Sequence, residues 1–367
     1  MIRLVLIGGG HAHVQVLAAL ARQPFADCEV TLISPFPRQI YSGMLPGWIA
    51  GHYSIEQCAI PIVDLARRSG VRFIESACTA LDIESKRAHC ANGEIVAFDA
   101  VSIDSGPIVD LGSVPGILEN AIPIRPIEGF VAVWPSMLER ARHNNAYTLS
   151  IVGDGAAGTE LAFAIQERFT IEQLTHARVI LIGGSKLALT GLPERLRDAA
   201  LSLLKQRNIE HLGERPASAF LPGRVRLSDA SEIACDASLV VTGAAAPLWP
   251  AASGMACDAN GFIRVTATLQ SISHRFVFAA GDVAAYAEPR PKSGVFAVRA
   301  GPLLADNLRA YCTGRTLCRW NSQKNALYLI STGKRHALAA WGPLSIGGDW
   351  VWRWKDRIDR RFMQRFT

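Results

Sequence analysis

The chain has 367 residues, of which 49% are hydrophobic and 19% charged, and its formal net charge is +6. This length exceeds that of one ordinary domain, and the high apolar share excludes disordered and fibrous proteins. The basic balance leaves three partner classes open: nucleic acid, an anionic membrane surface and anionic small molecules.

The eight cysteines are scattered along the chain, without a C-x-x-C pair or a Cys/His cluster at zinc-ligand spacing. We therefore expect reduced thiols, no metal site and a cytoplasmic location. The first apolar run, Ile2–Ile7, enters a glycine turn and is too short for a signal peptide. The longest uncharged run, Ala237–Cys257, is interrupted by proline and glycine, which predicts a strand and a loop rather than a membrane span.

The strongest organisational signal is an internal repeat. Ile2–Leu20 and Thr148–Ile165 share one pattern, an apolar strand, a glycine-rich turn and an amphipathic helix. Each is followed by a second apolar strand, Glu29–Ile33 in the first unit and Arg178–Ile182 in the second. Such βαβ units build parallel sheets, so the predicted fold class is α/β with two Rossmann-like domains.

Further buried strands and two crossing segments outline the domains. The strands are predicted at Val71–Ile74, Ala100–Ile103, Ser238–Val241 and Phe276–Ala279. Gly- and Pro-rich stretches at Ser105–Pro126 and Thr242–Gly254 indicate crossings between domains. We predict an FAD-binding domain at 1–107 and 255–317, an inserted NAD(P)H-binding domain at 108–254, and a C-terminal interface segment at 318–367 that ends in an amphipathic helix.

The first glycine turn is imperfect as a dinucleotide-binding motif. Gly8 permits the tight strand-to-helix turn, and Gly10 lets the backbone approach a pyrophosphate at the helix N-terminus. His13 stands where a third glycine is expected, and Ser34 where an acid would bind a ribose. Because no carboxylate is near the two histidines, we expect His11 and His13 to line the nucleotide or to pack beneath it.

The second glycine turn is complete. Gly153, Gly155 and Gly158 are all present, and the helix start between them is rich in alanine. Lys186 follows the next strand and meets either a 2′-phosphate or solvent, so NADH and NADPH both remain open. Two dinucleotide folds in one chain predict hydride transfer between a nicotinamide and a flavin.

The pair of turns resembles the FAD-dependent pyridine nucleotide-disulfide oxidoreductases, which hold FAD in the first fold and NAD(P)H in the second. Phe276–Val283 is similar to the second flavin motif of that family, in which an aspartate, here Asp282, reaches the ribityl and phosphate region of FAD. The resemblance covers most of residues 1–310.

A narrower resemblance rests on Gly8–Val14, Tyr41–Gly47 and the aromatic and basic residues of Trp350–Met363. These segments resemble type II NADH dehydrogenases, sulfide:quinone reductases and the flavoprotein module joined in front of selenophosphate synthetase. The chain departs from that pattern in lacking a redox dithiol and the cysteines that sulfide oxidation needs. Gly294–Arg299 stands in place of the Ala-Gln-x-Ala-x-Gln run at the quinone end, and nothing in the sequence links the chain to selenium metabolism.

The resemblance implies a set of site residues. A helix beginning near Gly294 would direct its positive end at the flavin. Lys292 and Glu160 are the implied catalytic residues, with Glu160 at the nicotinamide. The residues implied in cofactor binding are Gly8, Gly10, His11, Ala12, Ser34, Arg38, Tyr41, Ser42, Gly43, Thr79, Gly281, Asp282, Lys292, Gly153, Gly155, Ala156, Ala157, Gly158 and Glu160.

We therefore expect an FAD-dependent NAD(P)H dehydrogenase that passes electrons to an acceptor, with a quinone as the favoured one. The alternative is a flavoprotein of weak activity that serves as a partner or regulatory module.

The tail carries most of the net charge. Residues 350–367 hold six basic and two acidic groups, +4 of the total +6, which leaves +2 on the body and argues against nucleic-acid binding. Trp350, Trp354, Ile358, Phe362 and Phe366 recur at i+4 spacing, which predicts a core stripe, a dimer seam or an interfacial helix on the inner face of a membrane.

Overall fold

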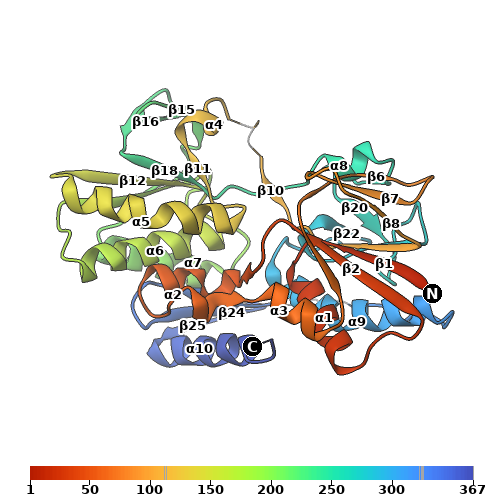
Figure 1. Ribbon diagram of the computed structural model, residues 1–367. Helices are drawn as coiled ribbons and strands as arrows, with labels where there is room; N and C mark the ends of the chain where they lie inside the picture. The colour runs from red at the N-terminus through yellow and green to blue at the C-terminus, as the bar shows by residue number, and fades with distance from the viewer. Residues whose placement is uncertain (111, 113, 322, 324–325, 367) are drawn as a thin grey trace.

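The computed structural model describes residues 1–110, 112, 114–321, 323 and 326–366. Two lobes lie side by side in Figure 1, each built around a parallel sheet. The first sheet has the strand order β21-β9-β1-β2-β5, and all of its pairings are parallel. Its strands are β1 (Ile2–Ile7), β2 (Cys28–Ser34), β5 (Arg72–Glu75), β9 (Ala100–Ile103) and β21 (Val277–Ala279).

The second sheet repeats the same design. Its order is β11-β18-β12-β13-β14, again with parallel pairing throughout. Its strands are β11 (Ile122–Pro123), β12 (Tyr147–Val152), β13 (Ala177–Ile182), β14 (Glu210–Leu212) and β18 (Ala237–Val240). The predicted α/β class with two Rossmann-like units is confirmed, as are the strands predicted from apolar runs.

Helices cover one face of the first sheet, and the antiparallel strands of residues 78–97 pack on the other through Leu81, Ala88 and Val96, which explains why its central strands are apolar on both faces. α1 and α9 lie side by side against the first sheet, and α5 and α6 flank the second (Figure 1). The longer helices are α1 (His11–Arg22), α3 (Ile62–Arg68), α5 (Ile127–His143), α6 (Ala156–Ile171), α7 (Glu194–Gln206), α9 (Gly294–Cys312) and α10 (Asp349–Met363).

Short elements complete the two lobes. The helical ones are η1 (Ser42–Met44), α2 (Leu45–Ile49), η2 (Glu56–Cys58), α4 (Ile117–Asn120), α8 (Trp249–Ala252) and η3 (Gly281–Val283). The strands are β3 (Gln39–Ile40), β4 (Ala59–Ile60), β6 (Cys78–Asp82), β7 (Arg87–Cys90), β8 (Ile95–Ala97), β15 (Ala217–Leu221), β16 (Arg224–Leu227), β17 (Glu232–Ala234), β20 (Ile263–Val265) and β22 (Ala284–Tyr286).

The two predicted crossings lie together. β10 (Ile108–Val109), in the outgoing segment, pairs antiparallel with β19 (Ala244–Ala245), in the returning one. This pairing places both connections between the lobes in one narrow strip (Figure 1).

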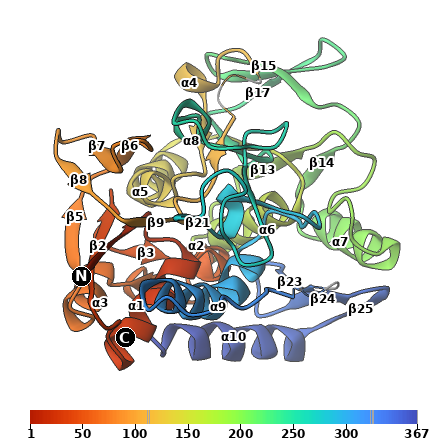
Figure 2. The same ribbon diagram turned by 90° about the vertical axis from the view of Figure 1, so that its right-hand side faces the viewer.

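The C-terminal segment forms a third layer. β23 (Leu327–Ser331), β24 (Ala337–Trp341) and β25 (Leu344–Gly348) form an antiparallel sheet that contacts α6 and α7. α10 packs on the same sheet and lies at the lower edge of the molecule in Figure 1 and Figure 2. Among the described residues, no helix combines the length and apolar character that crossing a bilayer requires.

The predicted single stripe on the C-terminal helix is wrong, because the structure divides it. An α-helix turns about 100° per residue, so each i+4 step drifts by about 40° around the axis. The first three side chains are exposed, Trp350 at 48%, Trp354 at 40% and Ile358 at 38%. The last two are buried, Phe362 at 6% and Phe366 at 1%.

The buried face of α10 follows alternating steps of three and four residues. It runs through Trp352, Lys355, Asp359 and Phe362 and continues past the helix end to Phe366. These steps keep the side chains on one side of the helix, which the i+4 series does not. Two charged residues therefore lie on the inner face, beside the site described next.

Candidate active site

The first glycine turn joins β1 to α1 by a close approach of backbone. Gly8 has φ +89°, and a Cβ there would lie 2.4 Å from the Asp104 carbonyl oxygen. A Cβ on Gly10 would lie 2.3 Å from the carboxyl carbon of Asp104. Only glycine satisfies both positions without displacing the neighbouring segment.

The two histidines of this turn have different surroundings. His13 lies beneath the turn, where its Nδ1–H donates to the Gly8 carbonyl at 2.6 Å and its Nε2 is 2.8 Å from the Ser102 hydroxyl. Burial lowers the pKa of His13 to about 4, so this ring is neutral and structural. The His11 ring lies 5.5 Å from that of Tyr41, and its buried Nε2 has no hydrogen-bond partner among the described residues.

Asp104 occupies the N-terminus of α1. Its Oδ2 accepts hydrogen bonds from the backbone N–H groups of Ala12, at 2.7 Å, and His13, at 3.0 Å. Burial raises the pKa of Asp104 to about 7, and the charge of Asp282 adds to the shift. Sequence reasoning missed this residue, although its place directly after the buried strand β9 was a usable signal.

The second flavin motif faces the same region. Gly281, with φ +71°, begins the single turn η3 at the end of β21, and Asp282 follows it. Burial raises the pKa of Asp282, whose Oδ2 lies 3.8 Å from Nη2 of Arg125. A Cβ on Gly281 would lie 2.4 Å from Oδ1 of Asp104, so the two predicted flavin motifs meet at that carboxyl group.

The loop before α2 and the start of α9 also come together. An ideal Cβ on Gly294, the first residue of α9, would lie 3.6 Å from Oγ of Ser42. Lys292 donates from Nζ to the Ala284 carbonyl at 2.6 Å and lies 3.7 Å above the Phe262 ring. Burial lowers its pKa to about 8, and its catalytic role stays a prediction.

Of three further implied cofactor residues, Ser34 lies beside the first glycine turn, where a Cβ on Gly9 would be 3.2 Å from its Oγ. Ser34 is buried at the end of β2, and its hydroxyl donates to the Phe36 carbonyl at 3.3 Å. Arg38 forms a two-point ion pair with Glu128 of α5, at 2.9 and 3.0 Å. Thr79 is exposed on β6.

The second glycine turn leaves its helix end open. A Cβ on Gly158 would lie 1.8 Å from the Gly153 carbonyl, so α6 packs directly against the turn. Gly155 is the N-cap of α6 and makes no side-chain capping bond. Ala156 and Ala157, the first residues of the helix, are at least partly exposed there.

An acid lies at the end of β13 although none follows that strand in sequence. Asp154, inside the glycine turn, reaches across to Gly183, where a Cβ would lie 1.8 Å from its Oδ2. Nε2 of His211 on β14 lies 3.1 Å from the same oxygen and orients the carboxylate. Asp154 of the glycine turn is thus a candidate for the ribose-binding acid, which sequence reasoning did not find after β13.

Glu160 and the inner face of α10 form a buried network. Glu160 accepts a hydrogen bond from the backbone N–H of Ser331 at 2.8 Å, and burial raises its pKa to about 7. Nζ of Lys355 lies 2.7 Å from Oδ2 of Asp359 and also donates to the Gly43 carbonyl. The Tyr41 hydroxyl donates to Oδ1 of Asp359 at 3.2 Å.

Neighbouring carboxylates keep the ammonium group of Lys355 charged in this network. Burial alone would lower the pKa of Lys355, but the charges of Asp359 and Glu160 outweigh it and keep the pKa above its ordinary value. Burial raises the pKa of Asp359, which the ammonium group of Lys355 partly counteracts. Lys355 and Asp359 carry opposite charges four residues apart, between apolar residues of the same helix face. This pairing was the signal that sequence reasoning missed.

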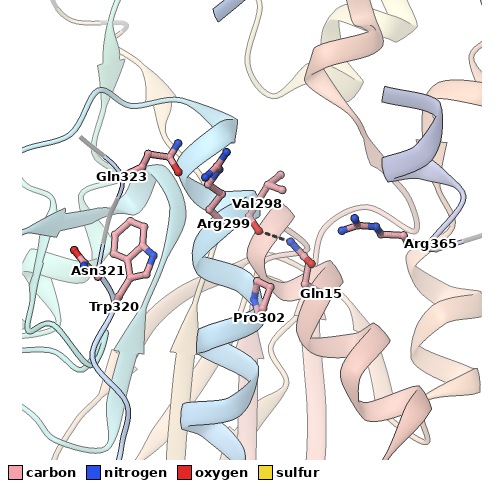
Figure 3. Close-up of a pocket in the computed structure, with 8 residues that line it drawn as sticks. All are labelled: Gln15, Val298, Arg299, Pro302, Trp320, Asn321, Gln323 and Arg365. Atoms are coloured by element: carbon pink, nitrogen blue, oxygen red, sulfur yellow. Dashed lines mark hydrogen bonds between the residues drawn. The ribbon is translucent and has the colours of Figure 1, made fainter. Parts of the chain in front are cut away.

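A separate pocket of 510 Å³ opens beside α9 (Figure 3). Gln15 of α1 lies on one side of it, and its side-chain amide donates to the Val298 carbonyl. Arg299 and Arg365 approach from α9 and from the end of the chain. The remaining lining residues are Pro302, Trp320, Asn321 and Gln323, so the pocket combines apolar surface with amide groups and two arginines.

Comparison with known proteins gives a family match over most of the chain. The family model described as "Pyridine nucleotide-disulphide oxidoreductase" matches residues 2–301. That range includes both glycine turns and the second flavin motif.

Curated relatives are distant but extensive. The chain is 26% identical over 349 residues to the demethylphylloquinone reductase NdbB of Synechocystis, a match that covers 90% of this chain and 85% of that protein. It is 25% identical over 230 residues to the alternative NAD(P)H-ubiquinone oxidoreductase C1 of Arabidopsis thaliana, covering 57% of this chain and 44% of the relative. The chain thus spans less than half of that second protein.

A solved structure shares the fold over the whole length. The sulfide:quinone oxidoreductase of Aquifex aeolicus superposes with a TM-score of 0.82 at 17% sequence identity, covering 100% of this chain and 91% of that one.

We predict that Lys355→Met lowers the free energy of unfolding by about 3–5 kcal/mol, because Asp359 is left buried and unpaired. Arg360→Gln on the same helix removes an ion pair to Asp356 whose arginine side chain is 46% exposed, and should cost less than about 1 kcal/mol. Urea unfolding of both variants measures the difference. Equal losses would contradict it, and Lys355→Met with Asp359→Leu should recover part of the loss.

Proposed function

The chain belongs to the pyridine nucleotide-disulphide oxidoreductase family, and we propose that it passes reducing equivalents from NADH or NADPH through FAD to a quinone-type acceptor. Membership confirms the expected class, an FAD-dependent enzyme that oxidises NAD(P)H. The quinone is the finer step of the proposal. It is supported by relatives named as reductases of ubiquinone and demethylphylloquinone.

The residues of the first lobe fit FAD. Gly8 and Gly10 bring the backbone close to the N-terminus of α1, where a diphosphate is stabilised. Asp282 follows β21 beside Gly281, and His11 offers a buried ring nitrogen that has no partner within the described ranges. FAD, when bound, accepts a hydride from a nicotinamide and releases electrons to a second substrate.

The open N-terminus of α6 would hold the diphosphate of NAD(P)H. Gly155 is the N-cap, and among the described residues the space beside it is open, so an anion can approach the backbone N–H groups of the first turn. Glu160 stands one turn further along the helix, and its carboxyl group is fixed by the Ser331 N–H. From there it would orient the carboxamide of the nicotinamide.

The observation that carries the proposal is the docking of the second lobe onto the loop of the first. Arg168 of α6 donates from Nε to the Ile49 carbonyl of α2 at 2.7 Å. Lys355 joins the Gly43 carbonyl to the carboxylate of Asp359, with Glu160 in electrostatic range. The two dinucleotide folds therefore converge on Tyr41–Gly43, which suits positioning of two reactants without an acid–base step.

A disulfide-reductase mechanism has no support in the chain. All eight cysteines lie in the described part of the structure as free thiols, and none stands in a C-x-x-C pair after the first glycine turn. The lack of such a pair favours an acceptor other than a disulfide, and a quinone is the one we propose.

The direct test is reduction of the purified protein. We expect visible flavin absorbance that NADH or NADPH bleaches under anaerobic conditions, and steady NAD(P)H oxidation once a soluble quinone is added. A protein that binds no FAD after reconstitution would contradict the proposal. Bleaching without turnover on any quinone would favour the alternative, a partner or regulatory flavoprotein.

We predict that Glu160→Gln keeps its FAD but is reduced by NAD(P)H about tenfold more slowly, a loss of about 1.4 kcal/mol. Glutamine still accepts the Ser331 hydrogen bond but cannot ionise, so the inflection of the wild-type rate near pH 7 should disappear. Stopped-flow reduction measures both effects. Glu167→Gln, on the same helix, is the control and should match wild type, and an unchanged rate in Glu160→Gln would remove the assigned role.

We further propose that the outer face of α10 docks on an anionic membrane. Trp350 and Trp354 stack at 6.4 Å on that face, and Ile358 continues it. Lys355 and Arg360 are paired within the helix, so the outward positive charge belongs to Arg353, Arg357 and Arg361, all exposed. Exposed tryptophans flanked by arginines suit the headgroup layer of a bilayer.

Vesicle flotation tests this docking. Trp350→Ser with Trp354→Ser should weaken binding to vesicles rich in phosphatidylglycerol by about tenfold or more, because two interfacial indoles are lost. The control is Leu118→Ser, a 70% exposed apolar residue on α4 at the opposite edge of the molecule (Figure 1). Unchanged flotation of the tryptophan variant would contradict the membrane proposal, and a change in oligomeric state alone would favour a dimer seam.

A further inference from the structure

The two glycine turns differ in what lies at their helix ends. At α6 Gly155 is the N-cap, and within the part of the chain that the structure describes a Cβ there would meet nothing within 4 Å. At α1 the N–H groups of Ala12 and His13 are already bonded to the carboxyl group of Asp104. The helix end expected to bind the FAD diphosphate therefore holds an acid of the chain itself.

Three glycines leave room for the carboxyl group of Asp104. Gly8 and Gly10 give it room on the side of α1, and Gly281 gives it room on the side of the second flavin motif. Oδ2 accepts both backbone hydrogen bonds, and Oδ1 lies toward Gly281. Asp104 is 3% exposed, so no solvent shell screens its charge.

An ionised Asp104 would oppose the ligand. A diphosphate brings negative charge to the same helix end, and Asp282 already places a second carboxyl group nearby. Repulsion between buried like charges raises the cost of keeping all of them ionised. A neutral carboxyl group removes the repulsion and adds a donor.

We propose that Asp104 takes up a proton from solvent when FAD binds and then donates a hydrogen bond from its new O–H to the diphosphate. Its other oxygen keeps the hydrogen bonds from Ala12 and His13. The proposal rests on FAD binding in the first lobe but not on the acceptor or on turnover. Asp104 is thus a binding residue that senses the charge of the cofactor.

The neighbouring groups allow this assignment. His11 and His13 on α1 are neutral, since burial lowers the pKa of each to about 4. Burial raises the pKa of Asp104 itself to about 7, so its proton is exchangeable near neutral pH. Tyr286 on β22 stays protonated because burial raises its pKa.

Three further charged groups face the region. Arg125 approaches Asp282 from the second lobe at 3.8 Å, and Asp282 lies on η3. Lys292, ahead of α9, has its pKa lowered to about 8 by burial and also titrates near the range of interest. Lys292 contributes equally to the pH dependence of FAD binding in wild type and in an Asp104 variant. The difference between these two pH dependences therefore reports on Asp104 alone.

The test measures FAD affinity of the apoprotein by flavin fluorescence, without NAD(P)H. For wild type we expect the dissociation constant to rise about tenfold or more from about pH 6.5 to about pH 8.5, as the proton becomes harder to supply. Asp104→Asn carries an N–H donor and an acceptor at all pH values, so its affinity should change far less. Asp99→Asn, at the other end of β9, should keep the wild-type dependence, because the hydrogen bonds from Arg3 hold the Asp99 pKa near 2.

Calorimetry of the wild-type protein and of Asp104→Asn gives a second readout that does not depend on fluorescence. FAD binding near pH 7.5, repeated in two buffers of different ionisation enthalpy, should show uptake of a fraction of one proton. Uptake in wild type that is lost in Asp104→Asn, together with a flat affinity profile in that variant, supports the proposal. No uptake, or an Asp104→Asn profile as steep as wild type, would overturn it and show that the carboxylate is displaced in ionised form.

Discussion

The arrangement of the site depends on one buried ammonium group. Lys355 lies on the inner face of α10, bonds the carboxylate of Asp359 one turn away, and donates to the Gly43 carbonyl of the first lobe. The charge of Glu160, on the second lobe, stabilises the same ammonium group. Since an unpaired charge is costly in a buried site, each of these parts is stable only in the presence of the others. The C-terminal layer thereby holds the two dinucleotide folds against one loop.

α10 therefore serves two purposes through its two faces. Its inner face carries Lys355 and Asp359 into the site, while its outer face exposes Trp350, Trp354 and Ile358. If the outer face meets a bilayer, the acceptor reaches the enzyme at the helix that also positions the reacting loop. Docking and catalysis would then share one structural element.

Buried carboxyl groups dominate the electrostatics of both cofactor regions. Burial raises the pKa of Asp104, Asp282, Glu160 and Asp359, so these acids can hold protons at higher pH than exposed ones. The cations nearby are fewer, chiefly Lys355 at the loop and Arg125 beside Asp282. We therefore expect the binding of anionic dinucleotides to be coupled to the protonation of the chain.

The βαβ repeat could be predicted from the residues alone, because apolar runs that end in glycine predict buried strands entering tight turns, and Gly8 and Gly153 indeed have positive φ. Local rules of this kind act over a few residues and need no partner. Asp104, Lys355 and Asp359 escaped prediction because their roles depend on segments far away in the chain, and burial turns an ordinary surface residue type into a site residue. The prediction of one i+4 stripe on α10 failed for the same reason. Helix geometry limits which residues share a face, but only the packing against β23–β25 decided which face is buried.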